Sequence, residues 1–376
     1  MKKKLPLFEA ISILVGTIIG AGILGIPYVV AKAGFLTGLV VLTIISYTVI
    51  MINLFLGEIV LSTRVKHQLT GYAEKYLGKW GKYLMFGSVV FGFYGALLAY
   101  IIGEGQVLAA LTGGSEVVYS LLFFVGASAL VYIGLTIVQK FEFIMTLIIL
   151  LIVIIITFWG FSSLNFSNLS QFDLSKLFIP YGVIFFAIGG TSAVPQLRLV
   201  LKGREKDIKK AILIGVSIPF IVYLIFTLIV VGITGMATTE IATIGLGQAV
   251  SKSMIIFGNI FAFFTMATSF LTLGLAIKST YLYDLKVKHG LAWSMAMLVP
   301  LAVFLLGLHG FVKVIGTVGA IGGGFEGLLI LAIYYKLKKK KTLERKPEYV
   351  LKYKPLLMMF LGLIFVGGII YTLINL

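Results

Sequence analysis

The sequence predicts an all-α polytopic membrane protein with about 11 transmembrane helices in a single domain, residues 1–376. Apolar residues make up 60% of the 376 positions, charged residues only 12%, and the mean hydropathy is +1.09. A soluble domain carries about a quarter charged residues and could not bury this much apolar surface. The short alternating segments of a membrane β-barrel do not occur in the sequence. Lipid is therefore the expected solvent for most of the chain.

The helices are predicted from stretches of about 20 apolar residues, the length that crosses a hydrocarbon core roughly 30 Å thick. Eleven such stretches follow one another, and no polar segment between them is long enough to form a second domain. They lie at about residues 8–32, 34–61, 83–111, 117–138, 142–162, 177–197, 209–236, 250–277, 290–309, 313–335 and 354–375. Residues 237–249 are predicted to form a short amphipathic lid.

Basic residues predict the orientation in the membrane. With the N-terminus in the cytoplasm, 27 of the 31 Lys and Arg residues fall on the inner side of the eleven predicted helices. This asymmetry is typical of multi-pass proteins of the cell membrane. An odd number of helices then places the C-terminus outside. Because membrane topology accounts for the net charge of +17, no nucleic-acid partner is expected.

Two of the predicted helices carry matching interruptions. The first contains "GTIIGAGILGIP" (16–27) and the sixth contains "FFAIGGTSAVP" (185–195), and in each a glycine precedes a proline by five residues. Because the two helices are five apart, the halves of the chain that contain them have opposite orientations. This pattern predicts 5+5 inverted repeats, 8–162 and 177–335, with discontinuous helices 1 and 6 and one extra C-terminal helix, 354–375. The alternative is that the small residues only allow close helix packing.

Broken helices at membrane depth need a cavity or a ligand, because lipid cannot satisfy free backbone amides and carbonyls. The amides near Ala21 and Gly22 begin the outer half-helix, and they offer an anion the positive end of the helix dipole. The carbonyls at the ends of the half-helices suit an ammonium group or a metal cation. Both features side by side fit a zwitterion, and the predicted ligand is therefore a small-molecule amino acid.

Three segments resemble a known family. "GTIIGAGILGIPY" (16–28), "FFAIGGTSAVP" and "TMATSFLTLGL" (265–275) are similar to the first, sixth and eighth helices of the amino acid/auxin permease family. This family is part of the amino acid–polyamine–organocation superfamily, and the closest similarity is to bacterial tyrosine and tryptophan permeases and to neutral amino acid transporters. The resemblance implies secondary active transport, by symport, of a neutral amino acid, with aromatic ones among the candidates.

The resemblance also implies the residues of the substrate site. By this resemblance, Tyr100 would reach the carboxylate of the substrate, and Phe186 would cover the side chain of the substrate. The substrate-binding residues implied in this way are Thr17, Ile18, Ala21, Gly22, Tyr100, Phe186, Ala187 and Gly189. The sequence departs from sodium-coupled leucine transporters at the outer start of the tenth helix, where Lys313 stands in place of an acidic residue. An outer ion-pair gate of their kind is therefore in doubt.

A sodium site is predicted opposite the first break. Thr268 and Ser269 are adjacent hydroxyls in the eighth predicted helix. They could bind Na⁺ together with the carbonyls of Gly16, Ile19 and Thr265, since hard cations take several oxygen ligands. The alternative is that both hydroxyls bond to carbonyls of their own helix.

The alternative coupling ion is the proton. Glu326 lies 13 residues after Lys313 and 10 before Lys336, about 20 and 15 Å from the two ends at 1.5 Å per residue. Glu104, in "YIIGEGQ", is the second candidate. Acids within the membrane are costly and mark ion or proton pathways. The alternative is that either carboxyl group only fixes helix packing. No lysine occurs in 143–162 to replace a cation, which favours sodium.

The sequence does not support an enzymatic function. The three histidines, His67, His289 and His309, stand apart, there is no cysteine, and neither a His-Glu-x-x-His pair nor a phosphate-binding loop is present. No cofactor is expected beyond a coupling ion, Na⁺ or H⁺, and no obligatory protein partner is evident beside the lipid bilayer. The alternative function is an amino-acid-sensing membrane receptor of the same fold, as in germinant receptors. Only seven residues precede the first predicted helix, which favours transport.

Overall fold

The computed structural model describes residues 5–134, 137–284, 286–339 and 343–376, and within these ranges the chain is helical without a strand. Each of the eleven predicted stretches contains a helix. Eight described helices are long and apolar enough to cross a membrane, or nine if one bent pair counts as a single span. Two more, Leu150–Ser163 and His289–Leu305, are apolar but shorter. The all-α polytopic class is confirmed, whereas the count of eleven spans is not established.

The first half of the chain contains the predicted break in the first helix, where two helices meet at an angle of 56°. It differs from the predicted pattern between the second and third stretches, where the segment 62–82 contains a short helix. Residues 135 and 136, inside the predicted stretch 117–138, lie outside the described residues. The helices are α1 (Leu5–Ile18), α2 (Gly22–Ala33), α3 (Phe35–Ser62), α4 (Leu69–Leu77), α5 (Lys79–Thr112), α6 (Glu116–Ile133) and α7 (Ile137–Gly160).

The second half begins with the other broken helix. Its helices are α8 (Tyr181–Ile188), α9 (Val194–Val200), α10 (Ile208–Thr234), α11 (Ala242–Val250), α12 (Lys252–Ser279), α13 (His289–Leu305), α14 (Phe311–Thr317), α15 (Gly324–Lys339) and α16 (Pro355–Ile374). A single 3₁₀ turn, Thr191–Ala193, separates α8 from α9. The predicted lid 237–249 contains α11.

The tenth predicted helix, 313–335, has a π-helical segment at its centre. Residues Val318–Gly323 connect α14 to α15 in this conformation. The segment lies against α8 at backbone distance, because a Cβ atom at Gly319 would lie 2.0 Å from Gly182 O. Single π-helical turns inside α-helices are frequent at functional sites. Hydropathy alone predicted an uninterrupted helix, since it does not respond to the hydrogen-bond pattern of the turn.

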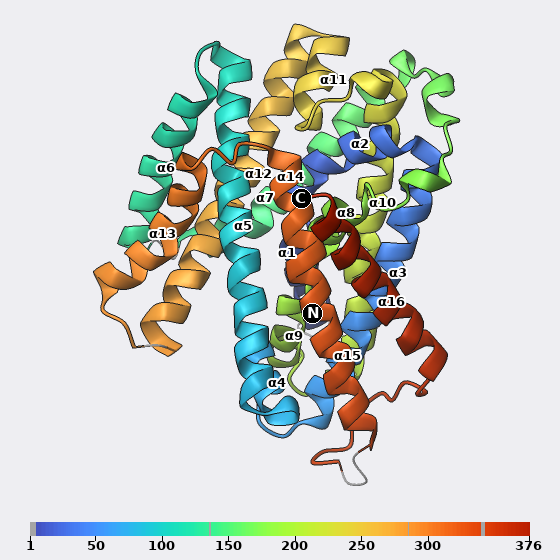
Figure 1. The fold of residues 1–376 in the computed structure, drawn as a ribbon, viewed down its shortest axis with the longest axis vertical. Helices are drawn as coiled ribbons and strands as arrows, with labels where there is room; N and C mark the ends of the chain where they lie inside the picture. Colours follow the sequence, from blue (N-terminus) through green and yellow to red (C-terminus); the bar gives the residue numbers. More distant parts are fainter. Residues whose placement is uncertain (1–4, 135–136, 285, 340–342) are drawn as a thin grey trace.

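The broken helices occupy the centre of the bundle. Figure 1 shows α4 and the end of α15 at one end of the molecule, and α2 and α11 at the other. We call these the α4 end and the α11 end. The helix α1 packs against α10, α3 packs against α10 and α8, and α5 packs against α12. The longer helices thus surround the two breaks.

The close contact between α8 and the tenth predicted helix depends on glycine. We expect Gly182→Ala to lower the melting temperature in detergent, because its Cβ would lie 2.1 Å from Gly316 O. Forcing one methyl group into such a contact costs roughly 1–3 kcal/mol. Gly87→Ala is the matched control, since nothing lies within 4 Å of the added Cβ on α5. Equal melting temperatures for the two variants would contradict the contact.

Candidate substrate site

The first break leaves backbone groups free. The helix α1 ends at Ile18 and α2 begins at Gly22, with Ala21 at the N-cap position and no side chain capping it. Within the described chain, the Ala21 amide and the Ile19 carbonyl have no hydrogen-bond partner. The positive end of α2 and an unpaired carbonyl therefore lie next to each other.

The second break is built in the same way. The helix α8 ends at Ile188, and Gly190 has a φ of −153° before the 3₁₀ turn. Pro195 stands in the first turn of α9, where its missing amide costs no hydrogen bond. The Gly189 carbonyl has no hydrogen-bond partner in the part of the chain that is described.

The two breaks pack against each other through their glycines. A Cβ at Gly22 would lie 2.5 Å from Ala187 Cα, and a Cβ at Gly190 would lie 2.6 Å from Ile18 Cγ1. The glycine of each break thus makes room for a residue of the other. The space that the sequence interpretation gave to a substrate carboxylate beside Gly22 is filled by Ala187.

A single buried hydroxyl joins the two breaks. Tyr223 of α10 is 0% exposed. Its Oη lies 2.8 Å from Ile18 O and 3.0 Å from Ala187 O, so that one proton is shared between the ends of α1 and α8. The Gly20 amide faces the same oxygen. Tyr223 therefore fixes the spacing between the two half-helices.

The breaks form the wall of a cavity of about 650 Å³. The wall of this cavity includes every residue that the sequence analysis assigned to substrate binding. These residues are Thr17, Ile18, Ala21, Gly22, Tyr100, Phe186, Ala187 and Gly189. The structure brings them together from α1, α2, α5 and α8, while their role in binding stays a prediction.

The cavity opens toward the α4 end and is closed toward the α11 end. Its wall includes Gln68 and Thr70 at the start of α4, and Gln68 is exposed. On the other side of the breaks, α2, α8 and α14 pack together directly. A Cβ at Gly25 would lie 2.7 Å from Ile315 Cδ1 and 3.3 Å from Val183 Cγ1. The three helices are therefore in direct contact around Gly25.

The lid contributes a second closure at the α11 end. The Val312 amide, in the first turn of α14, donates to Glu240 Oε2 at 3.1 Å. A carboxylate at a helix N-terminus is favoured by the helix dipole. Lys313 stands where the sodium-coupled leucine transporters have an acid. In this chain the lid instead reaches the tenth predicted helix through a bond from carboxylate to backbone.

The predicted sodium ligands are partly assembled. Gly16, Ile19, Thr268 and Ser269 line the cavity, whereas Thr265 does not. Thr268 Oγ1 donates to Phe264 O at 2.7 Å, which is the ordinary bond of a hydroxyl to its own helix. The helix α1 barely touches α12. The binding of Na⁺ by these residues stays a prediction.

Ser269 lies between the first break and α5. A Cβ at Gly20 would lie 3.2 Å from Ser269 Oγ, and the Tyr100 hydroxyl faces the same hydroxyl from α5. Tyr100 was assigned to the substrate carboxylate. Its hydroxyl here faces Ser269 of α12.

The two candidate acids lie in different surroundings. Glu326, at the start of α15, lines the cavity and accepts a hydrogen bond at Oε1 from Thr191 Oγ1, in the second break. Glu104 is 0% exposed, lies beside the backbone of Ala267 in α12 and does not line the cavity. Neither of its carboxyl oxygens has a hydrogen-bond partner of normal geometry in the described structure. Only Glu326 is joined to a break.

Sequence reasoning missed Tyr223 and Thr191. Thr191 lies within the quoted motif of the sixth predicted helix, so a hydroxyl in the break was a usable signal. Tyr223 is the one tyrosine in the apolar stretch 209–236, four residues after Pro219, and it stands among other hydroxyl side chains such as Ser217 and Thr227. Nothing in the sequence places it between the two breaks.

The chain is similar to known transport proteins over most of its length. It is 26% identical to glutamine transporter 2 of Aliivibrio fischeri over 356 residues, which are 90% of each chain. It is 27% identical to the tyrosine-specific transport system 1 of Haemophilus influenzae over 348 residues, 87% of each chain. A third match, to the low affinity tryptophan permease of Proteus vulgaris, is 24% identical over 234 residues and covers 57% of this chain and 55% of the relative.

The family comparison agrees with these matches. The profile of the tryptophan/tyrosine permease family matches residues 3–375, nearly the whole chain. The relatives are permeases and transporters of amino acids, not enzymes. With its apolar helices and broken central spans, the chain is a multi-pass membrane protein that belongs to the tryptophan/tyrosine permease family.

Proposed function

We propose that this chain is a secondary active transporter that carries a neutral amino acid across the cell membrane by alternating access. One observation carries the proposal. Two broken helices meet at a cavity that opens toward only one end of the molecule, and Tyr223 joins them. The Ala21 amide suits a substrate carboxylate, and the free carbonyls of Ile19 and Gly189 suit its ammonium group.

The lining of the cavity supports a neutral side chain. Glu326 is the one charged residue in the described wall, and its carboxyl is bonded to Thr191. Phe86, Phe93 and Phe186 add aromatic surface. An aromatic amino acid or glutamine is the expected substrate, in agreement with the names of the relatives.

The conformation corresponds to an inward-facing state in this proposal. The sequence predicts that 64–82, 198–210 and 336–354 carry basic residues on the cytoplasmic side. The open mouth of the cavity lies beside α4, within the first of these segments. The lid and the packed helices α2, α8 and α14 then close the outer side.

Two places in the cavity could take the coupling cation. Sodium would bind at Thr268 and Ser269 once α1 approaches α12 and its carbonyls complete the shell. A proton would bind at Glu326, where the hydrogen bond to Thr191 connects the carboxyl to the second break. In both cases the ion and the substrate share a broken helix, so each affects the affinity of the other.

Transport is tested by exchange. Purified protein in liposomes that contain unlabelled L-tyrosine, L-tryptophan or L-glutamine should take up the same labelled amino acid from outside. The free backbone groups at the breaks become reachable from either side in turn. Empty liposomes are the control. Tight binding of one of these amino acids without exchange, under any imposed gradient, would contradict transport. It would favour the alternative hypothesis that the protein is an amino-acid-sensing receptor.

Tyr223→Phe should weaken binding of the transported amino acid about tenfold. The substitution removes only the hydroxyl, whose shared hydrogen bond to Ile18 O and Ala187 O is worth about 1.4 kcal/mol net, which corresponds to about tenfold in affinity. Tyr281→Phe is the control, because its hydroxyl bonds to Tyr94 Oη at 2.6 Å, away from the breaks. Equilibrium binding measures both variants. Equal affinities would mean that the spacing does not depend on Tyr223.

The coupling ion is tested by binding at fixed pH. We expect substrate affinity to rise with Na⁺ concentration in the wild type. Replacing both Thr268 and Ser269 with Ala should abolish the Na⁺ dependence, because the carbonyl ligands alone cannot hold a dehydrated cation. Glu326→Gln should keep the dependence. Na⁺-independent binding whose pH dependence is lost in Glu326→Gln would assign the coupling to protons instead.

A further inference from the structure

The C-terminal end of α3 is capped by side chains from other segments. The last carbonyls of a helix have no partner within it, and cations near them are favoured by the helix dipole. Arg198 Nη1 donates to Val60 O at 2.7 Å and to Thr63 O at 2.6 Å. Arg345 Nη1 donates to Leu61 O at 2.9 Å. Two guanidinium groups from distant parts of the sequence thus donate hydrogen bonds to the last carbonyls of α3.

Arg198 has no acidic partner. It is 6% exposed, and it forms no ion pair with any carboxylate in the described ranges. Its guanidinium also reaches Arg64 O at 3.4 Å, and the Tyr72 hydroxyl lies beside it. If α9 moved away from α3, a buried cation and several carbonyls would lose their partners together, which is strongly unfavourable. The two helices are therefore expected to move as one body.

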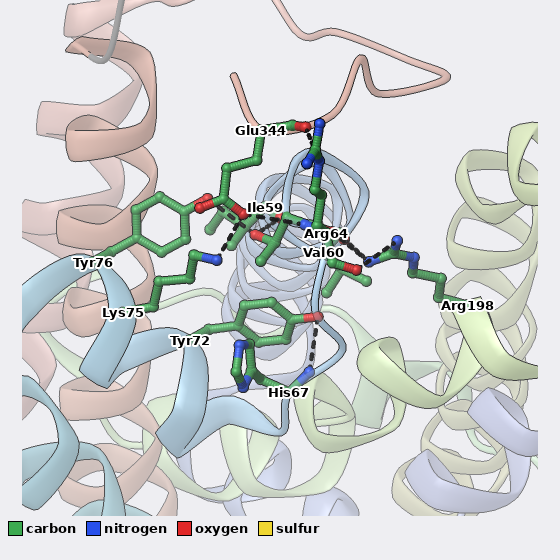
Figure 2. A network of polar contacts seen from close by, with 10 residues as sticks. Ile59, Val60, Arg64, His67, Tyr72, Lys75, Tyr76, Arg198 and Glu344 are labelled. Atoms are coloured by element: carbon green, nitrogen blue, oxygen red, sulfur yellow. Dashed lines mark hydrogen bonds and ion pairs between the residues drawn. The ribbon is translucent and has the colours of Figure 1, made fainter. Parts of the chain in front are cut away.

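The same helix end is tied to α4. Glu344 Oε2 forms an ion pair with Lys75 Nζ at 2.7 Å, and Arg64 Nε donates to Glu344 O at 2.9 Å. Thr63 Oγ1 and Tyr76 Oη lie 3.0 Å apart. Figure 2 shows Arg198 approaching the end of α3 from one side, and Lys75 and Tyr76 of α4 approaching it from the other.

These contacts lie at the mouth of the cavity. Gln196, two residues before Arg198, lines the cavity from α9. Gln68 and Thr70 line it from the start of α4. The end of α3 therefore joins two walls of the mouth, although Arg198 itself is not part of the lining.

We propose that Arg198 is a positioning residue of the transport cycle, which makes the inner half-helix α9 move together with α3 when the mouth opens and closes. The inference rests on the proposed transport function. Arg198 acts through α9 and does not touch the substrate. Arginine suits the role because its planar fork can serve two carbonyls at once, whereas lysine keeps the charge but loses this geometry.

Arg198→Lys is the first test. With labelled L-tyrosine, L-tryptophan or L-glutamine as the probe, exchange in proteoliposomes should slow at least tenfold. The dissociation constant of the same amino acid should change less than threefold. Arg204→Lys is the matched control, because Arg204 pairs with Asp207 three residues further on, in the turn before α10. Its exchange rate should equal that of the wild type.

A second readout follows the mouth itself. The chain has no cysteine, so Gln196→Cys introduces a single thiol at the wall of the cavity. In this background the probe amino acid should slow labelling by a thiol reagent, because the mouth closes. Adding Arg198→Lys should remove that protection. A purely structural role would change the yield of folded protein and leave the effect of the amino acid on labelling intact.

The outcomes separate the two proposals. Wild-type exchange and intact protection in Arg198→Lys would overturn the positioning role. A wild type that binds but does not exchange would refute transport, and the labelling readout would still test Arg198. If Arg198→Lys cannot be purified as folded protein, Arg198→Gln decides, since its side-chain amide keeps a neutral donor for the carbonyls at the end of α3. It should also remove the protection of position 196 by the probe amino acid, and intact protection would overturn the proposal.

Discussion

The structure depends on one constraint, which is that lipid cannot satisfy a free backbone amide or carbonyl. Two central helices are nevertheless interrupted at the middle of the bundle. The Tyr223 hydroxyl donates to two of the carbonyls that the breaks leave free, Ile18 O and Ala187 O. The residues whose backbone groups remain free, among them Ala21, line the cavity. The cavity therefore lies beside the free backbone groups, and a zwitterion is the ligand that we propose for them, because its two charges match both kinds of group.

Packing makes the two breaks one unit. Gly22 leaves room for Ala187, and Gly190 leaves room for Ile18, so neither break can shift without the other. The same unit extends to the α4 end through α9, where Arg198 caps α3. On the other side, α8 lies against the π-helical segment Val318–Gly323 at backbone distance. In the proposed transport cycle, these contacts would carry movements at the substrate site into both the mouth of the cavity and the tenth predicted helix.

Much of this arrangement could be predicted from the sequence, because it follows from local composition. Apolar stretches located the helices, and the glycine-to-proline spacing located both breaks. What could not be predicted depends on contacts between distant segments. The bond from Tyr223 requires the position of α10, and the closeness of Gly22 to Ala187 requires the packing of the two breaks. Thr268 is an example. A hydroxyl in a membrane helix can bind an ion or donate to a carbonyl of its own helix, and the sequence does not distinguish the two. In this structure the Thr268 hydroxyl donates to Phe264 O of its own helix.

The two candidate acids show what the cavity adds to depth in the membrane as a guide to function. Both Glu104 and Glu326 lie well inside predicted helices, and the sequence analysis placed Glu326 first because it is the deeper of the two. Glu104 is enclosed between α5 and α12, away from the cavity. Glu326 lies in the wall of a cavity that reaches the surface, and its carboxyl is bonded to Thr191. A proton that moves during transport needs a path to water and a contact with a moving element. Glu326 lines the cavity and bonds to a break, whereas Glu104 does neither, which is why we propose Glu326 as the site of the proton if protons are the coupling ion.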